Sequence, residues 1–147
     1  MAVNDFIAIA PLLVLALGAT LVMLQIAFLR SVTLTGVVAI LSLLAAAGSC
    51  LYAIAATPLQ VGALLHADAY ALLFCVLFAL AGTATCGLSL DYIQHHGDEP
   101  EEYFLLLVLA TLGACVLAYA VHPASLLLGL ELLSVSLYAL IAYPNRS

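Results

Sequence analysis

Long apolar runs, separated by short polar segments, dominate the pattern of residues along this chain. An α-helix rises about 1.5 Å per residue, so about 20 apolar residues cross a hydrocarbon core about 30 Å thick. Five runs reach this length, and the first two contain no charged residue. We therefore expect membrane-spanning helices at about residues 6–29, 33–56, 69–90, 101–121 and 123–143.

Local signals mark where several of these helices begin or end. Asp68 stands directly before the third run as an N-cap, and Glu101 and Glu102 suit the positive end of the fourth helix. Pro144 ends the fifth helix, because proline cannot continue it. Pro11 falls near the start of the first run, where we expect it to cost little.

The composition agrees with a membrane protein. Of the 147 residues, 67% are hydrophobic and 7% are charged, whereas soluble domains have about 45–50% apolar and about 25% charged residues. The N-terminus "MAVNDF" lacks the cations of a secretory signal, and the runs lack the alternation of a membrane β-barrel. The sequence therefore predicts an all-α integral membrane protein with five transmembrane helices, whose backbone groups are satisfied within each helix.

Two arginines predict the orientation. Arg30 follows the first predicted helix and Arg146 follows the fifth, so both fall on the same side of the membrane. The positive-inside rule makes that side cytoplasmic, which places the N-terminus in the periplasm. Six of the seven tyrosines also fall near predicted helix ends, where rings of this kind favour the interface: Tyr52, Tyr70, Tyr92, Tyr103, Tyr119 and Tyr143.

Most polar features favour structural interpretations. The segment "HHGDEPEE" could hold a metal ion through His95, His96, Asp98 and Glu99, but we favour a solvated loop, and we place His66 in an outer loop. A net charge of −6 argues against nucleic acid as a partner. Four cysteines have no metal-type spacing and are expected to be small buried residues: Cys50, Cys75, Cys86 and Cys115. Small residues at four-residue spacing predict close helix packing: Ala79, Thr83 and Gly87, then Ser125 and Gly129.

Glu131 does not fit these structural interpretations. It falls near the middle of the fifth predicted helix, where an ionised group costs at least about 2.5–3.5 kcal/mol. Ser134 and Tyr138 follow at helical spacing on the same face, so we expect this face to point into protein or a water-filled cavity. His122 falls on the opposite face near the outer end, and for it we favour a structural role over a proton relay.

The counter-ion of Glu131 is missing from the sequence. The chain contains no lysine, and Arg146 falls about 22 Å away if the helix continues. A carboxylate whose cation can approach and leave would act as a proton-loading switch. We therefore expect the cation to come from outside these residues.

Three segments carry a resemblance to a known family. The run "HPASLLLGLELLSVSLYALIAY", the preceding "EEYFLLLVLATLGACVLAYAV" and the earlier "HADAYALLFCVLFALAG" resemble the fifth, fourth and third helices of subunit N of bacterial proton-pumping NADH:quinone oxidoreductase, respiratory complex I. In that family, a glutamate of the fifth helix pairs with a lysine on a later helix during proton translocation. Glu131 matches this glutamate through its setting in "LGLELLS".

The resemblance implies a subunit of a multi-pass complex in the bacterial inner membrane. Residues 1–66 would form two leading helices and an outer loop, 67–100 the third helix and an acidic cytoplasmic loop, and 101–147 the first two helices of an antiporter-like repeat. Because family members are much longer, we expect a truncated or split product whose missing C-terminal part supplies the buried lysine. The other membrane-arm subunits would be its partners. Quinone and NADH would serve the whole complex, with no cofactor bound by this chain.

Two alternatives remain open at the level of the sequence. The chain could belong to a multisubunit cation/proton antiporter or a membrane-bound hydrogenase, whose subunits share the glutamate. It could also be a small structural or assembly membrane protein, in which Glu131 serves only helix packing. The first two interpretations expect Glu131 to affect proton transport directly, and the third expects effects only through assembly.

Overall fold

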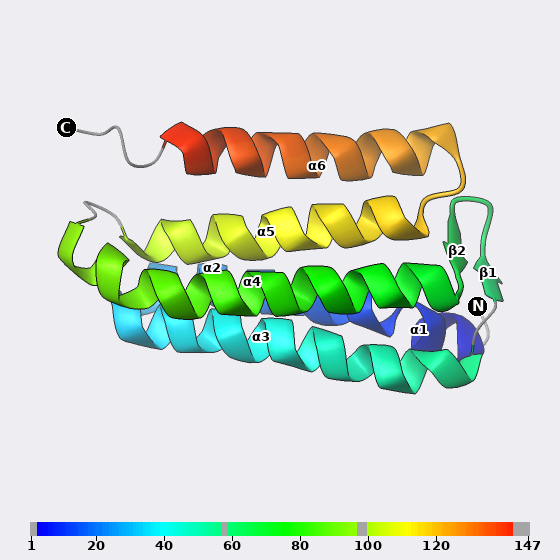
Figure 1. Ribbon diagram of the computed structural model, residues 1–147, viewed down its shortest axis with the longest axis horizontal. Coiled ribbons are helices and arrows are strands. Elements are labelled where there is room, and N and C mark those ends of the chain that lie inside the picture. Colours follow the sequence, from blue (N-terminus) through cyan, green and yellow to red (C-terminus); the bar gives the residue numbers. More distant parts are fainter. Residues whose placement is uncertain (1–2, 57–58, 97–99, 143–147) are drawn as a thin grey trace.

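Five long helices form the body of the protein (Figure 1). The computed structural model describes residues 3–56, 59–96 and 100–142. Each long helix contains an apolar stretch sufficient to cross a membrane: α2 (Ala10–Phe28), α3 (Val32–Ala53), α4 (Ala69–His96), α5 (Pro100–Tyr119) and α6 (Pro123–Ala142). The prediction of an all-α protein with five helices long and apolar enough to span a membrane is confirmed, and this supports a multi-pass membrane protein.

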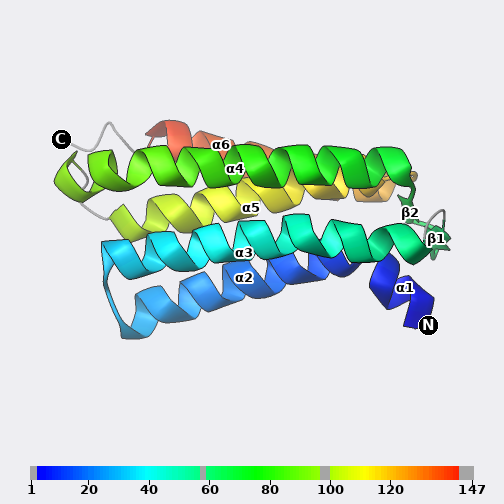
Figure 2. The same ribbon diagram turned by 60° about the horizontal axis from the view of Figure 1, so that its bottom comes forward.

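The helices pack side by side with α5 at the centre. α5 contacts α2, α3, α4 and α6, whereas α6 packs mainly against α5 and forms one edge of the bundle (Figures 1 and 2). The N-terminal residues lie at the end of the bundle opposite to the last residues of α6. This arrangement leaves much of the surface of α6 free of contacts within the described chain.

The first predicted helix is broken in the structure. A short helix, α1 (Val3–Ala8), ends before Ile9, and α2 begins at Ala10 with Pro11 in its first turn. Figure 2 shows α1 turned away from the axis of α2. Proline has no amide hydrogen and its ring clashes with the carbonyl group four residues earlier, so the helix restarts there. The expected start near Phe6 is therefore wrong.

The acidic segment is mostly helical rather than a loop. α4 continues to His96, beyond the expected end at Leu90, and α5 already begins at Pro100. The hydroxyl groups of Ser89 and Tyr103 lie 2.8 Å apart and join the two helices. The residues after Leu90 are more polar but continue the helix, so the end of the apolar run does not mark the end of α4.

A β-hairpin occupies the segment that we expected to be an outer loop. β1 (Leu59–Val61) and β2 (Leu65–Ala67) pair antiparallel, with Gly62 in the turn at a φ of 63°. The carbonyl oxygen of Leu64 accepts hydrogen bonds from the Val121 amide at 3.1 Å and the Ser125 hydroxyl at 2.7 Å. The hairpin is thereby attached to the start of α6, and His66 lies in a strand.

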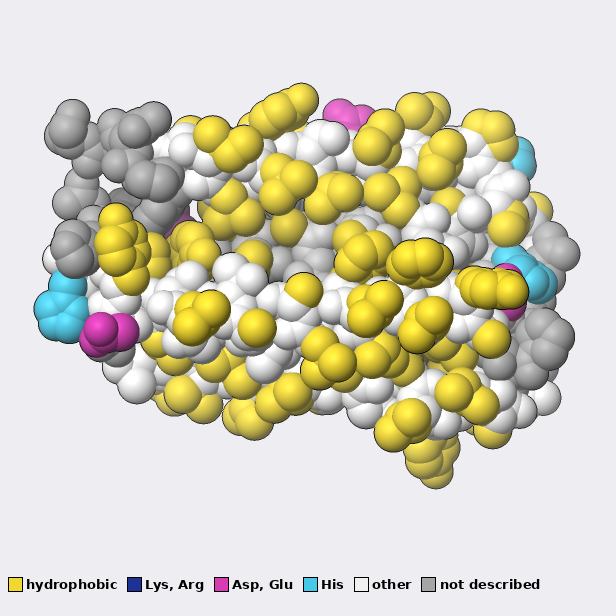
Figure 3. All heavy atoms as spheres, in the orientation of Figure 1, with side chains coloured by type: hydrophobic (Ala, Val, Ile, Leu, Met, Phe, Trp, Pro, Cys, Tyr) yellow, Lys and Arg dark blue, Asp and Glu magenta, His cyan; other side chains and the backbone are white. Residues whose placement is uncertain are grey.

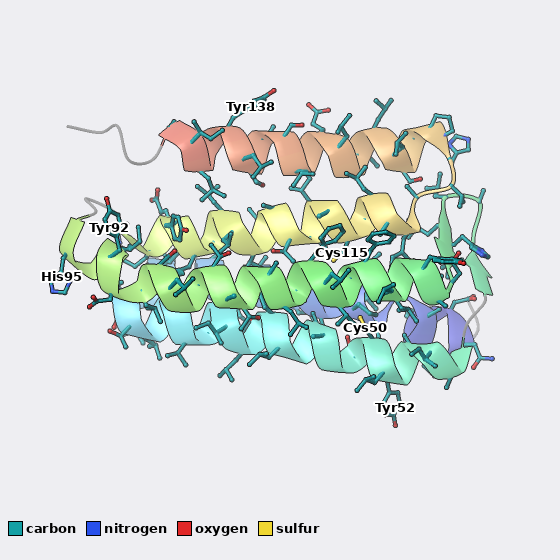
Figure 4. The ribbon with its side chains drawn as sticks, in the orientation of Figure 1. Cys50, Tyr52, Tyr92, His95, Cys115 and Tyr138 are labelled. Atoms are coloured by element: carbon teal, nitrogen blue, oxygen red, sulfur yellow. The ribbon has the colours of Figure 1, made fainter. Side chains whose placement is uncertain are left out.

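The small residues predicted to promote packing do so in part. All four cysteines are buried, as predicted, and Cys50 and Cys115 lie among the helices in Figure 4. Gly129 packs against Val116 and Leu117 of α5, which confirms the predicted close approach of α6. Gly87, however, is exposed, and a Cβ atom added there would meet no other side chain or helix within 4 Å, so its predicted packing role is wrong.

The tyrosines divide into surface and core positions. Tyr52, Tyr70 and Tyr92 are exposed near helix ends, as predicted, and Tyr52 points outward in Figure 4. Tyr119 is fully buried, and its hydroxyl donates a 2.9 Å hydrogen bond to the carbonyl oxygen of Ala8. We expected this ring to lie at the interface of the membrane with water, which is wrong for Tyr119. The ring can be buried in the core because the Ala8 carbonyl oxygen provides a hydrogen-bond partner for its hydroxyl group. Tyr143 lies outside the described residues.

Candidate functional site

Glu131 lies near the middle of α6 and is exposed. α6 packs through a narrow stripe of small residues, Ser125, Gly129 and Ser136, which are its buried positions. At about 100° per residue, these positions lie about 120–160° around the helix from Glu131. The carboxylate therefore points away from α5, because the small residues allow close approach on the opposite side only.

The neighbours of Glu131 on its own face are also turned outward. Ser134 is half-buried, and Tyr138 is 71% exposed and points away from the bundle in Figure 4. The three predicted site residues thus share one face of α6. Within the described chain, this face does not point into protein or a cavity, so that expectation is wrong for the chain by itself. The signal in the sequence for the side that faces α5 was the four-residue spacing of Ser125 and Gly129, which lie opposite Glu131.

The surroundings of this face are apolar. In Figure 3 the acidic and histidine side chains lie at the two ends of the view, except for one acidic side chain at the middle of the upper edge, and hydrophobic side chains cover much of the middle. On α6 itself, the exposed positions beside Glu131 include Leu127, Leu128 and Val135. A membrane around this bundle would therefore place the Glu131 carboxylate among lipid chains unless another polypeptide covers it.

No cation of the described chain reaches Glu131. Arg30 lies between α2 and α3 at one end of the bundle, and its Nη2 atom is 3.9 Å from Oε1 of Glu102. Across residues 3–56, 59–96 and 100–142, no ion pair involves Glu131. Arg146 lies outside the described residues. A counter-ion from outside these residues stays a prediction.

His122 belongs to the start of α6 rather than to the Glu131 face. Its Nδ1 atom accepts a 3.1 Å hydrogen bond from the Ala124 amide, and its carbonyl oxygen accepts one from the Leu126 amide at 3.0 Å. These contacts cap the helix. Nine residues separate His122 from Glu131, or about 13 Å along the axis, so the structure does not bring them together.

The other polar residues considered from the sequence do not form a second site within the described regions. His95 and Asp91 lie one helical turn apart with 3.9 Å between Nδ1 and Oδ1, whereas Asp98 and Glu99 fall outside the described residues. Asp68 caps α4 as predicted: its Oδ1 accepts a 2.7 Å hydrogen bond from the Ala71 amide. No metal-binding group of three or more ligands occurs among the residues that the structure describes.

One relationship near the outer hairpin was not anticipated. Nε2 of His66 lies 4.0 Å from Oδ2 of Asp68, and both side chains are 36% exposed. His66 lies in β2 and Asp68 follows two residues later, and alternate residues of an extended segment lie on the same side. Such a solvated pair contributes little stability.

An exposed carboxyl group at the middle of an apolar helix can do two things chemically. It can take up and release a proton, and it can form an ion pair or hydrogen bond with a group on a neighbouring helix. Ser134 and Tyr138 add hydroxyl groups on the same face. The chain matches no known protein-family model.

Proposed function

We propose that this chain is a membrane-arm subunit, or part of one, of a proton-translocating NADH:quinone oxidoreductase, and that Glu131 takes part in proton transfer. The observation that carries the proposal is the outward position of Glu131 on α6, opposite the stripe that packs against α5. A carboxylate in a membrane interior is expensive, and such residues usually serve transport. The resemblance of the chain to subunit N, which is most specific from Asp68 onward, supports this assignment.

The outward face requires a partner in this proposal. A transmembrane helix carrying a lysine would cover Glu131, exclude lipid and stabilise the ionised carboxylate. Movement of that cation would favour proton uptake by Glu131, and its return would favour proton release. The partner helix belongs to a further part of the same subunit or to another membrane-arm subunit.

Ser134 and Tyr138 would extend the proton path along the covered face, since hydroxyl groups both donate and accept hydrogen bonds. His122 has a capping role at the start of α6 and is not part of the proposed path. NADH and quinone would react elsewhere in the complex, and this chain would bind neither.

The proposal includes a location and an orientation. Arg30 and the last turn of α6 lie at the same end of the bundle, opposite α1 (Figure 1). By the positive-inside rule, this end would face the cytoplasm and the N-terminus the periplasm. The membrane would be the bacterial inner membrane, where a complex of this kind couples electron transport to proton transport.

Proton pumping in inverted membrane vesicles tests the role of Glu131. NADH-driven acidification is followed by dye quenching beside NADH-dependent quinone reduction in Glu131→Gln, Glu131→Asp and wild-type vesicles. We expect Glu131→Gln to lose most pumping at unchanged subunit composition, and Glu131→Asp to retain a substantial part because it keeps a titratable carboxyl group.

Three results would contradict the proposal. Full pumping by Glu131→Gln in an assembled complex would show that the carboxyl group is not needed for transport. A loss of pumping that merely follows loss of assembly would favour a structural or assembly protein, in which Glu131 serves only packing. Failure to co-purify with any NADH:quinone oxidoreductase subunit would favour the antiporter or hydrogenase alternative.

A further inference from the structure

A second feature lies between α2, α5 and the last turns of α6. A cavity of about 530 Å³ is lined by apolar residues of all three helices and by Glu102. A smaller cavity of about 200 Å³ continues along α2 and α5, and the two share Met23 and Leu105. Together they form one groove, which we call the α2–α5 groove.

We propose that the α2–α5 groove binds one acyl chain of a zwitterionic phospholipid with an ethanolamine headgroup, and that Arg30 and Glu102 bind its headgroup. The proposal is independent of the role of Glu131, which does not line the groove and lies about 12 Å and about 16 Å along the axis from Ala139 and Ala142. It assigns a ligand to a cavity that proton translocation does not use.

The length of the groove fits a lipid chain. On α2 it extends from Ala27 to Ala16, and on α5 from Glu102 to Leu112. At 1.5 Å per residue these distances are about 16 Å and about 15 Å. Half of a hydrocarbon core about 30 Å thick is about 15 Å, so the groove matches one leaflet. A transmembrane helix would instead need a groove along the whole bundle.

The shape and chemistry of the groove also fit an acyl chain. Ala16, Ala19 and Ala27 of α2 leave space beside α5, and leucine side chains of α5 form the opposite wall. Among the described residues that line the two cavities between Glu102 and the far end, the only polar side chain is Thr20, whose hydroxyl already donates to the Ala16 carbonyl oxygen at 2.9 Å. The interior therefore offers apolar contacts without unsatisfied polar groups.

The mouth of the groove carries both signs of charge. Glu102 lines the cavity, and the Arg30 guanidinium lies 3.9 Å from its carboxylate. Their side chains are 44% and 55% exposed, so this ion pair is solvated and contributes little by itself. A guanidinium group binds phosphate with paired hydrogen bonds, and an ammonium group donates to a carboxylate. The pair is thus complementary to phosphate and ethanolamine in one headgroup.

Native mass spectrometry of the purified full chain tests this proposal. The probes are 1-palmitoyl-2-oleoyl phosphatidylethanolamine and the corresponding phosphatidylglycerol, titrated into detergent micelles. We expect wild-type protein to bind phosphatidylethanolamine more tightly than phosphatidylglycerol. Arg30→Gln should weaken both lipids about tenfold, the factor for losing one charge-assisted hydrogen bond, and Glu102→Gln should weaken phosphatidylethanolamine alone by about the same factor.

A matched pair of alanine variants tests the apolar part. Ala27→Phe should fill the groove and abolish the phosphatidylethanolamine adduct. Ala45→Phe places the same ring in a hollow between α2 and α3 that has no charged lining residue among those described, and it should leave the adduct unchanged. Equal adducts in both variants would overturn the proposal, as would equal weakening of the two lipids by Glu102→Gln.

Photocrosslinking distinguishes a lipid from a protein occupant in the native membrane. With photo-methionine in place of Met23, which lines both cavities and keeps nearly the same side-chain volume, a crosslink to phospholipid supports the proposal, and a crosslink to a polypeptide overturns it. The same photoreactive residue at position 45 of a Met23→Leu variant is the control for general exposure to bulk lipid. Position 23 should give a defined adduct enriched in phosphatidylethanolamine relative to position 45, and identical adduct compositions would overturn the proposal.

Discussion

Gly113 of α5 lies directly against the backbone of Leu133 in α6. A Cβ atom at position 113 would come within 2.7 Å of the Leu133 nitrogen and 3.1 Å of the Gly129 carbonyl oxygen. Close approach through small residues is a common way for membrane helices to associate. Because α6 packs mainly on α5, this contact positions the helix that carries Glu131.

Gly113→Ala should therefore displace α6 and destabilise the bundle. We expect a loss of about 1–3 kcal/mol in the free energy of unfolding, as for overpacked cores. SDS titration of the purified chain, followed by far-UV circular dichroism, measures this change. Gly87→Ala is the control, because a Cβ there meets no atom within 4 Å. Equal effects of the two variants would show that the α5–α6 approach does not limit packing.

Tyr119→Phe should loosen the short N-terminal helix. The variant removes the hydroxyl that donates to the buried Ala8 carbonyl oxygen, which costs about 1–3 kcal/mol when the acceptor is left unpaired. Hydrogen–deuterium exchange should rise in α1 relative to wild type. Tyr52→Phe, at a position that is 76% exposed, should change nothing. Unchanged exchange in α1 upon Tyr119→Phe would mean that other contacts hold this helix.

Asp68→Ala should destabilise the start of α4 by about 1 kcal/mol, since it removes the N-cap. Asp68→Asn keeps a side-chain oxygen for the Ala71 amide and should retain most of the stability. Both variants remove the charge that faces His66, but only the alanine variant also removes the cap, so their difference measures capping alone. Thermal unfolding in micelles provides the measurement, and an asparagine variant as unstable as the alanine variant would assign the effect to the charge.

Glu131→Leu should leave the isolated chain at least as stable as wild type. The exposed carboxylate has no ion-pair partner in the described parts of the chain, and leucine suits a lipid-facing position. Gly129→Leu, two residues away, is the opposite control because its side chain would collide with Val116 and Leu117. The free energy of unfolding in SDS is measured for both variants and for wild type. A marked loss of stability in Glu131→Leu would mean that the carboxyl group packs within this chain.

Several parts of the fold follow from the sequence without knowledge of neighbouring helices. A membrane span needs a long apolar run whatever surrounds it, so hydropathy placed all five long helices. The Asp68 cap is a local contact with the next turn and was predicted for the same reason. The central position of Glu131 in its helix was also readable, because it depends only on where α6 begins and ends.

The side of each helix on which a side chain is buried depended on tertiary packing. Tyr119 and Tyr52 both fall near helix ends in the sequence, yet one is buried against Ala8 and the other faces outward. Every face of these helices is apolar, so periodicity does not distinguish lipid-facing from core positions. The sequence by itself determined that a carboxyl group lies in the middle of a helix long and apolar enough to cross a membrane. The spacing of Ser125 and Gly129 indicated a packing side of α6, but only the tertiary structure decided that Gly113 of α5 meets the α6 backbone there. This contact on one side of α6 turns Glu131, on the other side, away from the bundle.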